Sequence, residues 1–240
     1  MPDLPPMFTA VAAREAGTSR GSLRHGIATG RLVSIRRGVF ARRDWWEARC
    51  REPGGEHAAR VAAVVLSSQL PMYASHYSAA ALLRLPVPSG EPVRPVFTSP
   101  MRGAMRRADR SWVVRNAALP TGSRVLVKIR GIGAVPATSP ARTSIDIARQ
   151  YGFAAGLVVA DAVLRRGLAT RRDLHRCAAG MAGWPGSVAA AAMVEYADGA
   201  RESPAESRSF ALFVTRGLVL PACNVWVVGE GRGGVRADFP

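Results

Sequence analysis

The chain has 240 residues, of which 48% are hydrophobic, and a formal net charge of +16 at pH 7. This apolar content supports a sizeable core and excludes a disordered chain, while the charge favours a polyanionic partner, either nucleic acid or an anionic membrane surface. Almost all of the positive charge is arginine, because Lys128 is the only lysine. Arginine suits bidentate contacts to phosphate and guanine, but a GC-rich genome would produce the same bias.

Cysteine spacing and hydropathy exclude further classes of protein. Cys50, Cys177 and Cys223 form an odd, widely spaced set without a CxxC pair, which argues against a disulfide scaffold and a zinc finger. The N-terminus lacks the pattern of a signal peptide, and the most apolar stretch, residues 156–164, is short and contains Asp161. The sequence therefore predicts a reduced, cytoplasmic protein without a membrane partner.

The first forty residues predict two short helices separated by a glycine turn. Residues 8–16 have apolar side chains on one side at helical spacing, and Gly17 is placed to end this helix. Thr18 and Ser19 can cap a second helix over residues 20–29.

A basic hairpin is predicted directly after the second helix. Residues 32–40 have strand composition around the turn Arg36-Arg37-Gly38. A helix, a turn, a helix and a basic hairpin are the order of a winged helix-turn-helix, in which the second helix reads the major groove of DNA. The candidate DNA contacts are Arg20, Ser22, Arg24, His25, Arg36 and Arg37. The alternative interpretation of the arginines is a solvated basic face.

Residues 44–55 are interpreted as a linker, and residues 56–200 as a central α/β domain. The predicted helices of this domain cover residues 57–67, 73–85, 141–150, 154–166, 170–178 and 185–197, and its predicted strands cover residues 92–98, 111–116, 124–129 and 133–136. A basic stretch over residues 101–110 is either the loop of a hairpin or a second nucleic-acid contact; it contains Arg102, Arg106, Arg107 and Arg110.

The last forty residues predict a capped helix followed by two strands. Ser203 and Glu206 have capping-box spacing before a helix that reaches about residue 215. Strands are predicted over residues 224–228 and 235–239, around a turn that matches the dinucleotide fingerprint G-x-G-x-x-G. Because a strand rather than a helix follows this turn, a hairpin loop is the favoured interpretation, and no cofactor or metal is predicted.

Several runs occur together in an order that resembles a known family. They are TSRGSLR at 18–24, RRGVF at 36–40, Ser75-His76, ATSPART at 137–143 with Asp146, Ala160-Asp161, RRG at 165–167, WPG at 184–186 and SPAES at 203–207. The set resembles actinobacterial proteins with an AbiEi-type antitoxin N-terminal domain, many of which continue into a nuclease-like domain of the very-short-patch-repair type. For AbiEi antitoxins the resemblance implies repression of their own type IV toxin–antitoxin operon and a nucleotidyltransferase-like toxin as partner.

For the longer members the resemblance implies a restriction-endonuclease-like C-terminal fold. Glu206 matches the helix glutamate of that fold and Asp238 matches its strand aspartate. The sequence stops before the strand that would supply the remaining metal-site acid, and metal-assisted cleavage needs several oxygen ligands. We therefore expect an incomplete, inactive nuclease-like segment, in which Glu206 has a capping role as its structural alternative.

Together these inferences predict an α+β protein with three parts. They are a winged helix-turn-helix over residues 1–45, the central α/β domain over 56–200 and the incomplete nuclease-like segment over 201–240. The predicted function is that of an antitoxin-like transcriptional regulator that binds double-stranded DNA. The alternatives are a metal-dependent DNA endonuclease or its inactive remnant, and a protein-interaction module that neutralises a toxin through its central domain.

Overall fold

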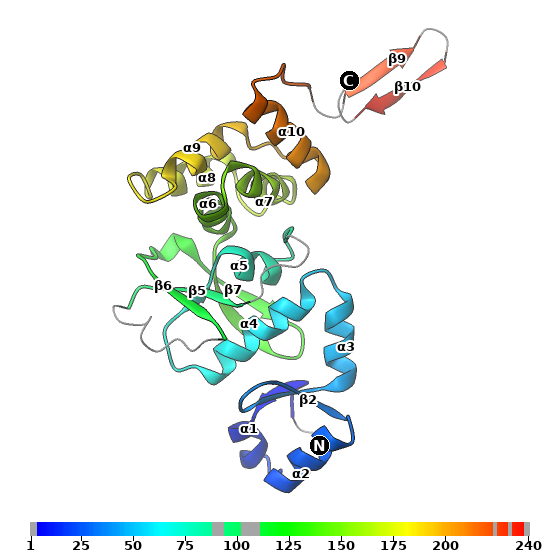
Figure 1. The fold of residues 1–240 in the computed structure, drawn as a ribbon, viewed down its shortest axis with the longest axis vertical. Helices are drawn as coiled ribbons and strands as arrows, with labels where there is room; N and C mark the ends of the chain where they lie inside the picture. The colour runs from blue at the N-terminus through cyan, green and yellow to red at the C-terminus, as the bar shows by residue number, and fades with distance from the viewer. Residues whose placement is uncertain (1–3, 88–93, 102–110, 223–224, 230–231, 238–240) are drawn as a thin grey trace. The chain divides into compact units, whose positions relative to one another are not determined.

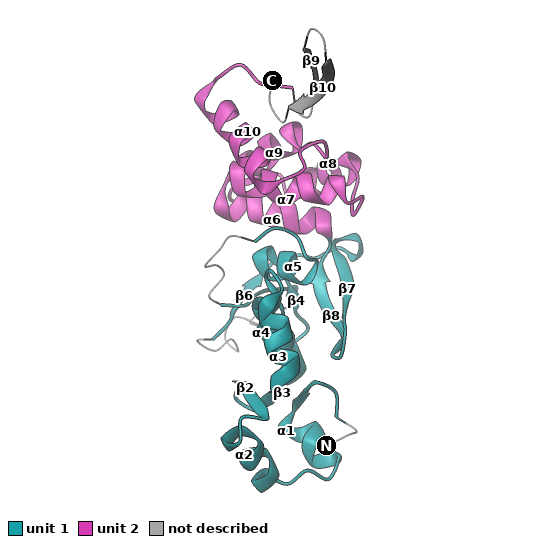
Figure 2. Cartoon of the chain, turned by 90° about the vertical axis from the view of Figure 1, so that its right-hand side faces the viewer, with its two compact units in different colours: residues 1–139 teal, residues 140–240 magenta. Residues whose placement is uncertain are grey.

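The computed structural model describes residues 4–87, 94–101, 111–222, 225–229 and 232–237. The protein has a mixed α+β fold (Figure 1). The chain divides into two compact units, Met1–Ser139 and Pro140–Pro240 (Figure 2). The predicted three-part division at residues 45, 56 and 200 stays a prediction.

Unit 1 begins with a three-stranded antiparallel sheet and two helices. The elements are β1 (Met7–Thr9), α1 (Ala10–Glu15), α2 (Arg20–Ala28), β2 (Leu32–Arg36) and β3 (Val39–Arg42), and the strand order is β1-β3-β2. The prediction of a helix over residues 8–16 was wrong for its first turn, which is strand β1. Thr9 ends this strand and caps α1, since its Oγ1 accepts the N–H of Ala12 at 3.1 Å.

The prediction of a linker over residues 44–55 was wrong, because most of this segment is the helix α3 (Arg43–Arg51). Trp45 and Trp46 on this helix pack against the core of unit 1. The indole rings anchor a segment whose other side chains are mostly polar, and burial of apolar surface stabilises a helix more than intrinsic propensity does. The neighbouring Pro-Gly-Gly run is the short connection to the next helix, since Gly54 is the N-cap of that helix and Gly55 its first residue.

A five-stranded mixed sheet forms the rest of unit 1, with the helices α4 (Gly55–Ser67) and α5 (His76–Leu82) packed against it. Its strands are β4 (Tyr73–Ala74), β5 (Val96–Ser99), β6 (Val113–Asn116), β7 (Arg124–Ile129) and β8 (Gly133–Thr138), in the order β6-β5-β4-β8-β7. Strands β5 and β6 pair in parallel, so the interpretation of residues 101–110 as a hairpin loop was wrong. The basic residues 102–110 themselves lie outside the described residues.

The two sheets of unit 1 share one hydrophobic core. Met7 and Val39 from the small sheet belong to the same buried cluster as Val61 of α4 and Val135 of β8. The N-terminal helices and hairpin are therefore fixed to the five-stranded sheet by common packing.

Unit 2 is a bundle of helices, and their bounds are close to the predicted ones. They are α6 (Pro140–Tyr151), α7 (Phe153–Arg165), α8 (Arg171–Ala179), α9 (Ser187–Tyr196) and α10 (Pro204–Arg216). α8 begins with a capping box, since Thr170 and Asp173 each accept the backbone N–H of the other residue with their side chains. Among the residues that the structure describes, no helix is both long and apolar enough to cross a bilayer.

The predicted C-terminal hairpin is confirmed as the antiparallel pair β9 (Val225–Gly229) and β10 (Arg232–Ala237). Asp238, the candidate strand carboxylate, lies outside the described residues.

Candidate nucleic-acid interface

Helix α2 is held with one face against the N-terminal sheet and the other toward solvent. Ser19 caps its start, since Ser19 Oγ accepts the N–H of Ser22 at 3.0 Å. Leu23 and Gly26 are its buried residues. A side chain at Gly26 would come within 2.8 Å of Leu32 on β2, so the absence of a Cβ lets the helix lie close to the sheet.

The exposed face of α2 carries two of the predicted arginines. Arg20 and Arg24 are one helical turn apart and both are exposed, as is His25. The small residues Gly21 and Ala28 lie on the same side of the helix. They follow Arg20 by one and eight residues, and at 3.6 residues per turn both offsets correspond to about a quarter of a turn from Arg20. This face therefore combines long cationic side chains with small residues that let the helix backbone come close to a partner. Such a face suits entry into the major groove of DNA.

Ser22 differs from the other predicted contacts, because its side chain is engaged within the helix start. Its Oγ lies 2.9 Å from Ser19 Oγ, and its N–H donates to the same atom. A hydroxyl in this position can still accept or donate one further hydrogen bond, but its local role is to reinforce the N-cap.

The predicted hairpin tip is the turn between β2 and β3. Arg37 is exposed and Arg36 is half-buried. Gly38 has a φ of +77°, which an L side chain rarely adopts, and its carbonyl accepts the N–H of Ala10 at 2.8 Å. This hydrogen bond fixes the tip to the start of α1, so the two arginines project from an anchored turn.

Two further arginines next to this face were missed at the sequence level. Arg14 on α1 and Arg31 after α2 are both exposed. The guanidinium of Arg31 donates to Thr29 Oγ1 at 3.2 Å, just beyond the end of α2. Residues 20–43 contain seven arginines and no aspartate or glutamate, so this segment attracts phosphate. One of the seven, Arg43, is paired with Glu47 of α3 at 3.6 Å.

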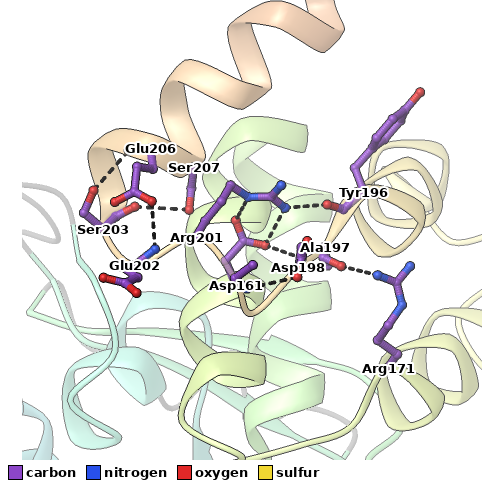
Figure 3. Close-up of polar contacts among 11 residues, drawn as sticks. Asp161, Arg171, Tyr196, Ala197, Asp198, Arg201, Glu202, Ser203, Glu206 and Ser207 are labelled. Atoms are coloured by element: carbon purple, nitrogen blue, oxygen red, sulfur yellow. Dashed lines mark hydrogen bonds and ion pairs between the residues drawn. The ribbon is translucent and has the colours of Figure 1, made fainter. Parts of the chain in front are cut away.

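Of the two nuclease-like candidates, only Glu206 lies among the described residues. Glu206 is buried and accepts the N–H of Glu202 at 3.0 Å, while its own N–H donates to Ser203 Oγ at 3.2 Å (Figure 3). These bonds are those of a helix cap. Among the described residues, no three histidine, cysteine, aspartate or glutamate side chains are grouped as a metal site requires.

The aspartate of the Ala160-Asp161 run belongs to a buried ion pair in unit 2. Asp161 forms a bidentate pair with Arg201, at 2.6 Å to Nε and 3.0 Å to Nη2, and accepts the N–H of Asp198 at 2.8 Å (Figure 3). Both side chains are 1% exposed. Burial raises the pKa of Asp161, and the pair with Arg201 acts in the opposite direction.

Two other runs of unit 2, ATSPART with Asp146 and WPG, meet in a second, partly buried cluster. Arg142 of α6 pairs with Asp146 at 2.9 Å, and Arg149 donates to the carbonyl of Pro185 at 3.0 Å. Both guanidinium groups lie over the ring of Trp184. These runs are accordingly explained by packing within unit 2 rather than by chemistry at a surface.

Burial raises the pKa of the Cys177 thiol to about 11. Only about one thousandth of this thiol is thiolate at pH 8, and the thiolate is the form that reacts with iodoacetamide. We expect alkylation of Cys177 in the folded chain to be far slower than that of exposed Cys50 at pH 8, and to rise with pH toward 11. Peptide mass spectrometry of the labelled chain checks this. The prediction fails if iodoacetamide alkylates Cys177 as fast in the folded chain in buffer as in the chain unfolded by urea.

Comparison with known proteins bears on the central part of the chain. Residues 79–196 match the family model described as the AbiEi antitoxin C-terminal domain. Two curated proteins of Mycobacterium tuberculosis, uncharacterized protein MT2308 of strain CDC 1551 / Oshkosh and uncharacterized protein Rv2248 of strain ATCC 25618 / H37Rv, are each 33% identical to this chain over 116 residues. This alignment covers 48% of this chain and 43% of each relative, so it spans less than half the length of these relatives.

A solved structure is similar to this chain in fold over most of its length. The crystal structure of the RV2827C protein from Mycobacterium tuberculosis superimposes with a TM-score of 0.50, at 17% sequence identity, over 93% of this chain and 80% of that one. At this identity the likeness concerns the fold alone. Residues 79–196 are therefore similar to the AbiEi antitoxin C-terminal domain.

Proposed function

We propose that this chain is a DNA-binding antitoxin that represses its own operon through a winged helix-turn-helix formed by residues 7–42. One observation carries the proposal: α2 presents Arg20 and Arg24 on an exposed face in a segment without acidic residues. The order β1-α1-α2-β2-β3 with sheet order β1-β3-β2 supports it, because this arrangement sets a second helix beside a basic hairpin.

In this proposal the two elements divide the work of recognition. Helix α2 enters the major groove, where Arg24 can donate two hydrogen bonds to guanine O6 and N7. Arg36 and Arg37 on the hairpin tip bind phosphates and set the register of the protein on the duplex, and each neutralised phosphate releases a counterion.

The operon of the proposal is a type IV toxin–antitoxin pair, with a nucleotidyltransferase-like toxin as the second product. The match of residues 79–196 to an antitoxin domain supports this partner class. Since the proposed target is the DNA of the operon, the site of action is the cytoplasm.

Binding to the DNA upstream of its own gene tests the proposal directly. The purified chain is titrated into that duplex and into a scrambled duplex of the same composition, across a salt series. We expect a preference for the upstream duplex of at least a hundredfold that persists at moderate salt. Equal affinities that fall together with salt would reflect counterion release alone and would contradict a sequence-reading regulator.

Arg24→Ala is expected to weaken binding to the upstream duplex by about 1–3 kcal/mol and to leave binding to the scrambled duplex nearly unchanged, since a bidentate guanine contact is lost. Fluorescence anisotropy with labelled duplexes measures both affinities. Arg172→Ala, at an exposed position on α8 in unit 2, is the matched control and should change neither affinity. Equal effects of the two variants would show that α2 is not the reading helix.

A further inference from the structure

Strand β7 (Arg124–Ile129) is the last strand of the five-stranded sheet and forms one of its edges (Figure 2). It pairs with β8 over six consecutive residue pairs without a register shift. Natural edge strands are commonly protected by a bulge, a proline, a short length or charged side chains such as lysine. β7 has no bulge and no proline, and its charged side chains are Arg124 and Lys128. Its outer row of backbone N–H and C=O groups is not used by any strand among the described residues.

The edge is held rigid by what surrounds it. Val125, Val127 and Ile129 point to the core of unit 1 and pack against it. The turn after β7 contains Gly131, whose missing Cβ would lie 2.8 Å from Pro6 and 3.4 Å from Trp45, so the turn fits closely against the N-terminal part of the unit. A strand fixed in this way can accept a partner strand without first becoming ordered.

The outward side chains of β7 alternate between charge and apolar surface. Arg124, Leu126 and Lys128 are all exposed, and Leu126 has 69% of its surface in solvent. None of the described residues from 68 to 139 is an aspartate or glutamate, so none of them neutralises the two cations. The guanidinium of Arg124 donates to the carbonyl of Leu119 at 2.7 Å. We call Arg124, Leu126 and Lys128, with the outer backbone row of β7, the β7 edge.

We propose that the β7 edge binds an extended acidic segment of a partner protein by strand addition, with the pattern acidic-x-apolar-x-acidic. In register, such a strand sets carboxylates opposite Arg124 and Lys128 and an apolar side chain opposite Leu126. Cross-strand pairs of this kind stabilise a sheet, and main-chain hydrogen bonds supply the rest of the affinity. The pattern reads the same in both directions, so it suits parallel and antiparallel pairing alike.

Charge argues against the two other occupants that the β7 edge could have, a second copy of this chain and a nucleic acid. A second copy paired antiparallel about Leu126 would set Arg124 of one chain opposite Lys128 of the other, and like charges directly opposite destabilise a sheet. A nucleic acid backbone gains nothing from the exposed Leu126, and the carbonyl oxygens that alternate with the N–H groups along the edge cannot donate hydrogen bonds to its phosphates. The edge belongs to the large sheet, so this proposal does not depend on DNA binding by residues 7–42.

The single lysine of the chain makes the test specific. The probe is the peptide acetyl-Gly-Thr-Glu-Val-Ile-Val-Glu-Thr-Gly-amide, whose carboxylates a carbodiimide can couple to the amine of Lys128. Mass spectrometry of the full chain should find the peptide on Lys128, and anisotropy of a labelled peptide gives its affinity. The same peptide with lysine in place of both glutamates should bind at least tenfold more weakly.

Substitutions separate the β7 edge from general charge. Lys128→Glu should weaken the acidic peptide at least tenfold and strengthen the lysine peptide, whereas Lys128→Arg should keep the affinity and lose only the coupling. Arg130→Glu, the same charge change in the adjacent turn, should change the affinity less than threefold.

Several results would overturn the proposal. They are no binding at millimolar peptide, equal binding of the acidic and lysine peptides, or equal effects of Lys128→Glu and Arg130→Glu. Lys128→Glu could also weaken binding to a random duplex. If it weakens duplex binding as much as peptide binding, the edge is a nucleic-acid surface instead. A concentration-dependent dimer in sedimentation that dissociates on addition of the peptide would show that a second copy occupies the edge.

Discussion

Asp161→Asn is expected to lower the free energy of unfolding of unit 2 by about 3–5 kcal/mol. The substitution keeps the shape of the side chain but removes the negative charge that faces Arg201, whose side chain is 1% exposed. The guanidinium would then be a buried cation without its carboxylate, and the low dielectric of the interior makes such a charge costly. Hydrogen exchange of the amides in α7 and α9, followed by mass spectrometry, measures the loss.

Two further variants test the cause of this loss. Glu195→Gln removes the charge of an exposed pair with His175 in the same unit and should cost about 0–1 kcal/mol. The double variant Asp161→Leu with Arg201→Met removes both charges and should recover much of the stability. If Asp161→Asn costs no more than Glu195→Gln, the buried pair does not hold unit 2 together.

Gly156→Ala is expected to destabilise unit 2 by about 1–3 kcal/mol, because it forces apart two helices that cross closely. A Cβ at Gly156 on α7 would lie 2.4 Å from the Cβ of Ala148 and 2.7 Å from its Cα on α6. The clash involves backbone, so no side chain can move away to relieve it. Alanine favours a helix over glycine by about 1 kcal/mol, and the expected loss is what remains after this gain. Urea unfolding followed by circular dichroism measures it.

Gly180→Ala is the matched control for that prediction. This residue also lies at a helix in unit 2, has an ordinary φ of −66°, and its added Cβ would be 3.5 Å from the nearest atom, the carbonyl oxygen of Arg176. We expect no loss of stability, and a gain of up to about 1 kcal/mol from the stiffer unfolded chain. Equal losses in the two variants would mean that the α6–α7 crossing tolerates the methyl group.

Local signals in the sequence predicted most of the helices. Ser19 and Ser203 were each identified as helix caps, and each accepts the backbone N–H three residues later in the structure. Such hydrogen bonds depend only on nearby residues, so the sequence contains all of the information. Helix α3 was missed because its stability depends on Trp45 and Trp46 reaching a core built from distant residues.

Pairing between distant segments could not be predicted in the same way. The composition of β5 and β6 indicated strands, but their parallel register is set by tertiary packing and not by any local turn. The pair of Asp161 and Arg201 joins residues that are forty positions apart, and nothing near either residue indicates its partner. The candidate DNA contacts were inferred from two adjacent elements and stay predictions, and Arg31 was not among them because it follows the end of α2.

Under the proposed function, the common core of unit 1 has a consequence for how operator specificity could be exchanged between relatives. Met7 and Val39 are buried together with residues of α4 and the five-stranded sheet, so residues 1–45 cannot be replaced as a cassette without also changing the surface that receives them. The outward face of α2 is free of that constraint. New specificities should therefore be obtained by grafting individual side chains at positions such as Arg20, Arg24 and His25, rather than by transplanting the whole N-terminal segment.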